Sequence, residues 1–229
     1  MANRNTVGFG LIPSGTLGGT PSTGGQNKYK IDSGYGSSIY LGQPVQYDTA
    51  GGANDNPGYI INGQDAITRS TIGVFNGCFY TDATTNKPTF SSYFPRTTAP
   101  ANSEDIDAFI IDNPFQQYNV QLDARLGANA AAAQAEMGKT LGLTVSANGA
   151  ASAASGSTIS GQSNSQLTVG GSNAVANQWR LLRSAEDPEN EDLITLPQLN
   201  PALAGFSGLA TVVVVANQSQ WFGSGQVSA

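Results

Sequence analysis

Residues 72–95 read IGVFNGCFYTDATTNKPTFSSYFP, and this stretch decides the fold expected for the chain. Apolar side chains occupy both parities of 72–80, a pattern that is typical of a strand buried on both faces. The run 81–87 supplies Asp, Asn and Thr side chains that favour turns, and Pro88 begins a second extended segment. Gly73 and Gly77 are expected to leave room for neighbouring rings or for a bend in the sheet. The stretch predicts a central β-hairpin without catalytic residues.

Similar patterns along the rest of the chain predict further β-structure. Strands are expected at 39–47, 59–61, 107–111, 118–122, 141–145, 179–183 and 209–216. Pro44 suggests an edge strand or a bend, and the run 128–137 is the only predicted helix, with Gly138 as its stop. About nine or ten strands in total predict a mainly β fold. We expect an antiparallel β-barrel or sandwich with long Gly-, Ser- and Ala-rich loops, an extended N-terminal arm and at most one short helix.

The chain is expected to divide into an extended N-terminal arm, 1–36, and a β-rich domain, 37–229. The arm is rich in Gly, Thr, Ser and Asn, and its apolar cluster is Val7, Phe9, Leu11 and Ile12. Because ordering a residue costs ~1 to 2 kcal/mol, these few side chains are too few to fold the arm against its own domain. The arm is therefore predicted to dock on a partner. A low-complexity Ala/Ser/Gly insertion is expected around 124–171.

Composition excludes many function classes. The 229 residues include 28 Gly and no His, and 11% of them are charged, against about a quarter charged in ordinary soluble proteins. Without His, the Ser-His-Asp triad, the usual general base and the commonest metal ligand are missing. Lys and Arg are scattered singly in a chain of net charge −6, which disfavours nucleic-acid binding. We predict no enzymatic activity, no cofactor, no metal and no nucleic-acid partner.

Cysteine content and hydropathy give two further expectations. Cys78 is the only cysteine, so no intrachain disulfide or thiolate zinc cluster can form, and we interpret it as a small buried apolar residue. The longest apolar run, 209–216, is far shorter than the ~20 residues that cross a bilayer. Residues 1–15 contain no apolar core of signal-peptide length. The chain is expected to lack a membrane partner and a classical export signal.

Two acidic clusters are candidates for chemistry. Glu104, Asp105 and Asp107 could form a carboxylate pair or a Ca²⁺ site, but a solvated loop is preferred because no Asp-x-Asp-x-Asp-Gly loop is present. The run 186–192 (EDPENED) is interpreted as a hydrophilic turn, with a Ca²⁺ ion or an Arg contact as the alternative. The aromatic residues Trp179, Trp221 and Phe222 are expected in a core or a subunit interface rather than stacked on sugar.

Several segments together resemble a known group of proteins. They are 3–11 (NRNTVGFGL), 38–45 (SIYLGQPV), 72–93, 111–114 (IDNP) with 118–123, 187–190 (DPEN) and 212–217. In these segments the chain is similar to capsid decoration (cement) and minor structural proteins of tailed bacteriophages. The resemblance covers most of the chain, although 124–171 departs from the compact pattern. It implies a protein without catalytic residues that binds the outer face of an icosahedral shell and bridges neighbouring major capsid subunits.

The leading hypothesis is therefore a virion structural protein that is made in the host cytoplasm and lies on the outer capsid surface. Its expected partners are the major capsid protein and further copies of itself, as a homo-oligomer or as self-contacts on the capsid lattice. The predicted capsid-binding residues are Val7, Phe9, Leu11 and Ile12 of the arm. The alternative is a receptor-binding or adhesive, fibre-like virion surface protein, and a glycosidase using Glu104 or Asp107 ranks third.

Overall fold

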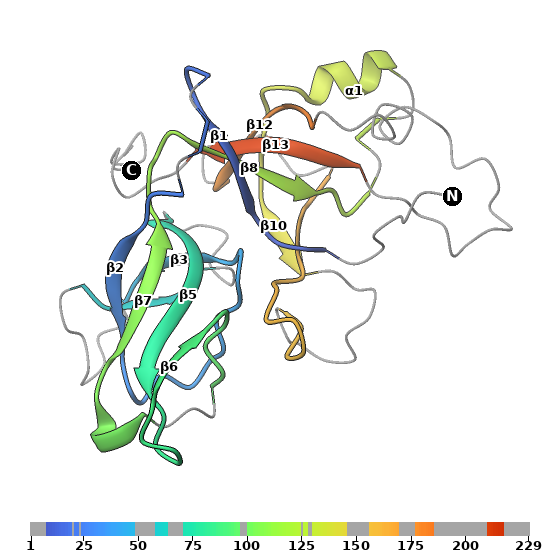
Figure 1. Cartoon of the computed structure of the whole chain (residues 1–229). Coiled ribbons are helices and arrows are strands. Elements are labelled where there is room, and N and C mark those ends of the chain that lie inside the picture. Colours follow the sequence, from blue (N-terminus) through green and yellow to red (C-terminus); the bar gives the residue numbers. More distant parts are fainter. Residues whose placement is uncertain are drawn as a thin grey trace, which may run out of the picture.

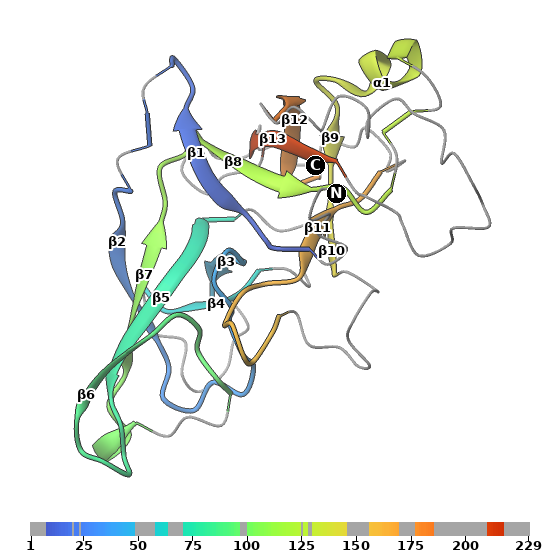
Figure 2. The ribbon, with the colours of Figure 1, turned by 45° about the vertical axis from the view of Figure 1, so that its right-hand side comes forward.

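The computed structural model describes residues 8–19, 21–22, 24–48, 58–63, 71–96, 100–124, 126–127, 130–145, 156–169, 177–185 and 210–217 (Figures 1 and 2). The fold is mainly β, with 51% strand and 6% helix, which confirms the predicted class. Its sheets are antiparallel and their arrangement is sandwich-like. Of the two predicted alternatives the sandwich is the one that fits, because the described strands form no closed barrel.

One sheet, called sheet A here, has five strands and is centred on the valine-rich run near the end of the described chain. In spatial order its strands are β1 (Ile12–Thr16), β8 (Gln116–Gln121), β13 (Thr211–Ala216), β12 (Trp179–Ser184) and β9 (Thr140–Leu141). Consecutive valines of β13, 212–215, are all buried, so this strand is covered on both faces. The strand predicted at 209–216 is confirmed for the part that the structure describes.

The second sheet, sheet B, carries the predicted hairpin. Its strands are β2 (Asn27–Ile31), β7 (Ile106–Ile111), β5 (Gly73–Thr81), β3 (Pro44–Tyr47) and β4 (Ile60–Asn62), with β6 (Pro88–Ser91) pairing with β5. The sheet is curled, so that its two outer strands come near each other: Lys30 of β2 forms a bridge with Tyr59, which directly precedes β4. The remaining elements are a strand pair, β10 (Leu143–Val145) and β11 (Ser165–Leu167), the short 3-10 helix η1 (Ala101–Ser103) and the α-helix α1 (Ala130–Glu136).

The predicted hairpin is confirmed, and its first strand contains a bulge that the sequence analysis did not predict. β5 and β6 pair antiparallel, and Asp82 holds the turn by accepting hydrogen bonds from the backbone N–H groups of Thr84 and Thr85. A β-bulge interrupts the pairing of β5 with β7 between Phe75 and Cys78. The bulge adds one residue and so reverses the parity of the strand beyond it. Phe75 and Cys78 therefore lie in the same core although their sequence spacing is odd.

Three other local expectations have different outcomes. Helix α1 falls inside the predicted 128–137 range, and Gly138 follows it with a φ of 80°, as expected of a helix stop. Pro44 does not lie on an edge strand, since β3 pairs on both sides, with β4 and β5. It occupies the first position of the strand, where proline is tolerated. The single strand expected at 141–145 is divided between β9 and β10, which belong to different sheets.

The predicted boundary between an arm, 1–36, and the domain, 37–229, needs correction for the part of the arm that the structure describes. Strand β1 pairs with β8 in sheet A, and β2 pairs with β7 in sheet B. Between the sheets, the backbone N–H of Leu11 donates to the carbonyl of Gly42 at 2.8 Å. The prediction of a separate arm considered only its few apolar side chains. The backbone hydrogen bonds of β1 and β2 offset part of the cost of ordering these residues. Strands β1 and β2 are thus an integral part of the β fold.

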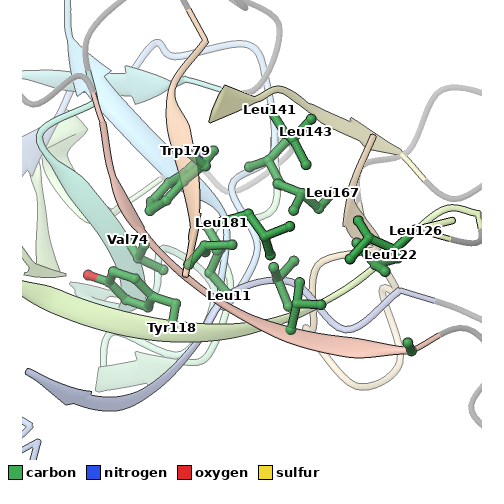
Figure 3. Packing of buried hydrophobic residues seen from close by; sticks show 14 of the residues in the cluster. Leu11, Val74, Tyr118, Leu122, Leu126, Leu141, Leu143, Leu167, Trp179 and Leu181 are labelled. Atoms are coloured by element: carbon green, nitrogen blue, oxygen red, sulfur yellow. The ribbon is translucent and has the colours of Figure 1, made fainter. Parts of the chain in front are cut away.

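Two hydrophobic cores hold the sheets together. The sheet-A core contains Trp179, Tyr118 and Leu181, together with Leu143 and Leu167 from the β10–β11 pair (Figure 3). Val74 of β5 and Ile111 of β7 also belong to it, although both strands are in sheet B. The sheet-B core packs against the opposite face of β5 and β7, and its buried residues include Ile31, Phe75, Phe94, Ile106 and Ile110. Strands β5 and β7 therefore contribute to both cores.

Candidate interaction surface

Three phenylalanines lie together on sheet B, and we call them the aromatic patch: Phe79, Phe90 and Phe109. Phe79 and Phe90 are paired across β5 and β6, and the ring centroids of Phe90 and Phe109 are 6.0 Å apart. Phe79 and Phe90 are 40% and 61% exposed, whereas Phe109 is half-buried. Burial of such rings is strongly favourable, so two neighbouring exposed rings are a candidate contact surface.

The bulge in β5 provides the seat of the patch. Gly77 has a φ of 127°, and a Cβ atom built there would lie 2.6 Å from Cζ of Phe90. The Phe90 ring therefore rests on the bare backbone of Gly77, in a space that any other residue would occupy. The expectation that this glycine leaves room for a neighbouring ring is confirmed. At Gly73 the close neighbour is backbone and not a ring, since a Cβ there would lie 2.3 Å from the carbonyl oxygen of Ile111.

The patch lies at one end of a face of sheet B, and the other end of the same face is buried. Along β7, Asp107, Phe109 and Ile111 share one face because side chains alternate with a period of two. Ile111 is covered in the sheet-A core, as is its cross-strand partner Val74. Strands β5 and β7 extend beyond sheet A toward β6 in both ribbon views (Figures 1 and 2). Past that edge the apolar face continues as the aromatic patch.

Two lysines border the patch on β2. Lys28 lies opposite Phe109 and Lys30 opposite Asp107, and both ammonium groups contact the Asp107 carboxylate at 3.0 and 2.5 Å. Partial burial raises the pKa of Asp107, but the hydrogen bonds and charges of Lys30 and Lys28 outweigh it, so the net shift is downward. The two lysine side chains remain 58% and 44% exposed. One carboxylate shared by two ammonium groups leaves an excess positive charge beside the rings.

The three described members of the predicted capsid-binding set differ in exposure and do not form one surface. Leu11 is buried in the sheet-A core, Phe9 is half-buried, and Ile12 is exposed on β1. Val7 lies outside the described residues. Leu11 has no surface left for a partner, because its own domain already covers it. Of this set, Ile12 is the described residue that stands open to solvent.

Exposed apolar side chains also occur at two other places. Ile12, Leu17 and Phe115 are exposed on sheet A, where the backbone N–H of Leu17 donates to the carbonyl of Phe115 at 2.8 Å. Ile159 is 98% exposed on the turn 157–161. This turn is held by hydrogen bonds from the backbone N–H groups of Ile159 and Ser160 to the Ser157 hydroxyl. The exposed side chains at sheet A and Ile159 are therefore both carried by backbone that is held by hydrogen bonds.

The candidate acidic cluster is occupied by structural contacts. Asp105 accepts a hydrogen bond from the Tyr59 hydroxyl, Asp107 is paired with the two lysines, and Glu104 is exposed. Within the described ranges, no group of three or more His, Cys, Asp or Glu residues could hold a metal ion. The acidic run 186–192 lies outside those ranges. Arg180, an arginine close to this run in the sequence, donates to the carbonyl of Gly138 and to Asn217 Oδ1.

Two further residues that the sequence singled out are buried. Cys78 is fully buried, and burial raises the pKa of its thiol to about 12, so the reactive thiolate is suppressed. Trp179 is also fully buried, edge-on to Tyr118 with 5.6 Å between ring centroids. Its core position agrees with the expectation and leaves no face for a sugar. Trp221 and Phe222 lie outside the described residues.

The sequence does not predict the aromatic patch, although Phe79 and Phe90 lie in the predicted hairpin and Phe109 lies in the strand predicted at 107–111. The strand that contains Phe79 was expected to be buried on both faces, but Phe79 is exposed. The one local signal is Gly77, which leaves the space that the Phe90 ring occupies. No helix in the described part of the chain is long and apolar enough to cross a membrane. Comparisons with protein-family models, with curated proteins and with solved structures find no match to this chain.

Proposed function

We propose that this chain is a virion structural protein that binds the outer surface of a tailed-bacteriophage capsid and stabilises it by bridging major capsid subunits. The observation that carries the proposal is the presence of large exposed apolar side chains at three separate places on an ordered β body: around Phe79 and Phe90, around Leu17 and Phe115, and at Ile159. A bridging protein needs at least two contact surfaces, one for each neighbour.

The arrangement of these places supports bridging. The turn after β1 and the hairpin β5–β6 lie at opposite ends of the molecule in both ribbon views (Figures 1 and 2). A partner on each end would therefore be a different subunit. The segments 38–45 and 72–93, which carry much of the resemblance to capsid cement proteins, supply β5 and β6 and half of β3. The two exposed rings of the aromatic patch, Phe79 and Phe90, are thus within the resemblance, whereas Phe109 lies outside it.

Stabilisation follows from mass action. A protein that binds only the assembled shell stabilises it by RT ln(1 + [L]/Kd) for each site, which is about 2.7 kcal/mol at a free concentration of 100 Kd. The symmetry of a shell repeats this gain at every equivalent site. Contacts that are individually weak are then sufficient, because several of them act on one bridging molecule.

The direct test is the copy number and heat resistance of particles. We expect quantitative mass spectrometry of purified particles to find this chain in numbers comparable with the major capsid protein. Shells assembled with the chain should also release their contents at a higher temperature than shells assembled without it. A few copies per particle, with no effect on heat release, would instead favour the receptor-binding or adhesive alternative. Absence from washed particles would overturn the proposal.

A further inference from the structure

We infer that the aromatic patch and its bordering lysines are a docking surface for a protein partner that presents apolar side chains bordered by carboxylates. The inference rests on the proposed function, in which that partner is the major capsid subunit. Three properties of the patch support it: its preorganised backbone, its charge and its size.

The patch is preorganised for binding. Phe79 and Phe90 are held on paired strands, and the Phe90 ring is seated over the Gly77 bulge and against Phe109. Association normally costs about 0.5 to 1.5 kcal/mol for each side chain that loses rotamer freedom. Rings that are already fixed lose less, so more of their burial energy is available to binding. This favours the patch over the exposed termini of longer side chains as an anchor.

The charge beside the patch indicates the chemistry of the partner. Lys28 and Lys30 share Asp107 and both remain partly exposed, so two ammonium groups with one carboxylate between them border the rings. Carboxylates at the rim of a partner surface would complement the two ammonium groups. A second copy is disfavoured, because a two-fold contact through this patch would place the same lysines on both sides.

The size of the patch indicates how the partner is presented. With 40% and 61% of their surfaces exposed, Phe79 and Phe90 together offer about 200 Å², if each phenylalanine contributes roughly 200 Å². A stable pairwise interface buries about 800 Å² on each partner. The patch alone is therefore too small for a lasting dimer. It suits a surface such as a shell, where one molecule is held by several contacts at once.

The first test compares loss of the exposed rings with a change elsewhere on the same hairpin. Phe79→Thr with Phe90→Thr removes the two exposed rings of the patch and keeps residues that favour strands. Lys87→Thr, at an exposed position in the turn between β5 and β6 and outside the three contact places, is the control. Each full-length protein is mixed with shells assembled from the major capsid protein encoded in the same genome, and bound protein is measured by co-sedimentation. We expect the double variant to bind about tenfold or more weakly, and the control to lose less than about threefold.

A second measurement uses the wild-type chain, so it does not depend on how a variant folds. Carbodiimide joins lysine amines directly to carboxylates that contact them, and cross-linked peptides are identified by mass spectrometry. Links from these lysines to Asp107, which they contact within the chain, should form in the free protein as well and are subtracted. In the shell-bound protein we expect additional cross-links from Lys28 or Lys30 to carboxylates of the shell subunit. Cross-links from these lysines to a second copy of this chain would overturn the inference and identify the copy as the occupant. Their absence from the shell-bound protein would also overturn it.

The two proposals fail in different ways. If the wild-type chain does not co-sediment with shells at any concentration tested, the proposed function itself is wrong. If the wild type binds and the double variant, folded by circular dichroism, binds equally well, the docking surface is wrong and the proposed function stands. Loss of binding in Lys87→Thr equal to that of the double variant would show that any change in the β5–β6 hairpin weakens binding, and would likewise overturn the inference.

Discussion

Gly77 shows how much one residue can decide in this fold. Both its φ of 127° and the Phe90 ring above it exclude a side chain. We expect Gly77→Ala to lower the free energy of unfolding by about 2 to 4 kcal/mol, because backbone strain and overpacking add. Gly18→Ala separates the two effects: its φ is 100°, but no atom lies within 4 Å of the new Cβ. Urea denaturation should rank Gly77→Ala below Gly18→Ala, and an equal loss would contradict the packing account.

Asp107 determines a pH effect at the same scale. Its folded-state pKa is below the ordinary carboxyl value, because Lys30 and Lys28 outweigh the effect of partial burial. The ion pairs therefore stabilise the fold above the unfolded-state pKa of about 3.9, and this stabilisation is lost as the pH falls through the lower folded-state pKa. The group is partly exposed, so the effect should be within about 1 kcal/mol.

Melting temperature measured against pH tests this assignment. Between pH 5 and pH 2, Asp107→Asn should lose less stability than the wild type, since the variant has no carboxylate to protonate at this site. Glu104→Gln, which changes an exposed carboxylate three residues away, is the control. If the curves for wild type and Asp107→Asn fall in parallel, the lysine pairs make no contribution to acid stability.

At the scale of elements, the first two strands are required for folding. A chain beginning at Ser37 lacks β1, β2 and the core residues Leu11 and Ile31. We expect it to show no cooperative melting transition. In the full chain, Leu11→Ala should lower the free energy of unfolding by about 2 to 5 kcal/mol, as for other buried leucines, and Ile12→Ala by less than about 1 kcal/mol.

Circular dichroism and urea denaturation distinguish this from an independent arm. If the chain beginning at Ser37 keeps the β-sheet spectrum and the melting temperature of the full chain, residues 8–31 are not part of the folding unit. Equal losses for Leu11→Ala and Ile12→Ala would also contradict the assignment of Leu11 to the core. The adjacent positions make a matched pair, since both are aliphatic and differ mainly in burial.

Elements with a strong apolar pattern could be predicted from the sequence, and the others could not for physical reasons. Strands β5 and β13 carry apolar runs of the kind that is typical of a strand covered on both faces. Strand β1 (IPSGT) has one large apolar side chain and is held by backbone pairing with β8. Strand β11 (SQL) is buried although mostly polar, and Gln166 is satisfied by Gln121 across the fold at 3.0 Å. Pairings between distant polar residues leave no local pattern.

The candidate surface was beyond prediction for a related reason. The sequence placed Phe79 and Phe90 in the correct hairpin, but their exposure depends on where sheet A stops covering sheet B. That limit is set by the length of β5 and β7 relative to β8 and β13, which only the assembled fold defines. The β-bulge adds a second obstacle, because it reverses the parity from which the buried face was inferred.

At the scale of the whole molecule, the two cores are coupled through shared strands and cross-sheet hydrogen bonds. Val74 and Ile111 connect sheet B to the sheet-A core. The Tyr118 hydroxyl donates to the carbonyl of Ile111 at 3.0 Å, and Gln178 Nε2 donates to the carbonyl of Gly63 at 3.3 Å. A bridging protein benefits from such coupling, because a load applied at one end is carried to the other by a single folded unit.

This coupling predicts one cooperative unfolding transition. With Trp221→Phe in the background, the fluorescence of Trp179 reports the sheet-A core alone, whereas far-ultraviolet circular dichroism reports both sheets. The two signals should change at the same urea concentration. Ile106→Ala is the sharper experiment, because Ile106 is fully buried in the sheet-B core. This change should shift the Trp179 transition by about 2 to 5 kcal/mol and the dichroism transition equally. If the dichroism moves while Trp179 does not, the cores unfold separately, and a load could not pass from one end of the molecule to the other without opening it.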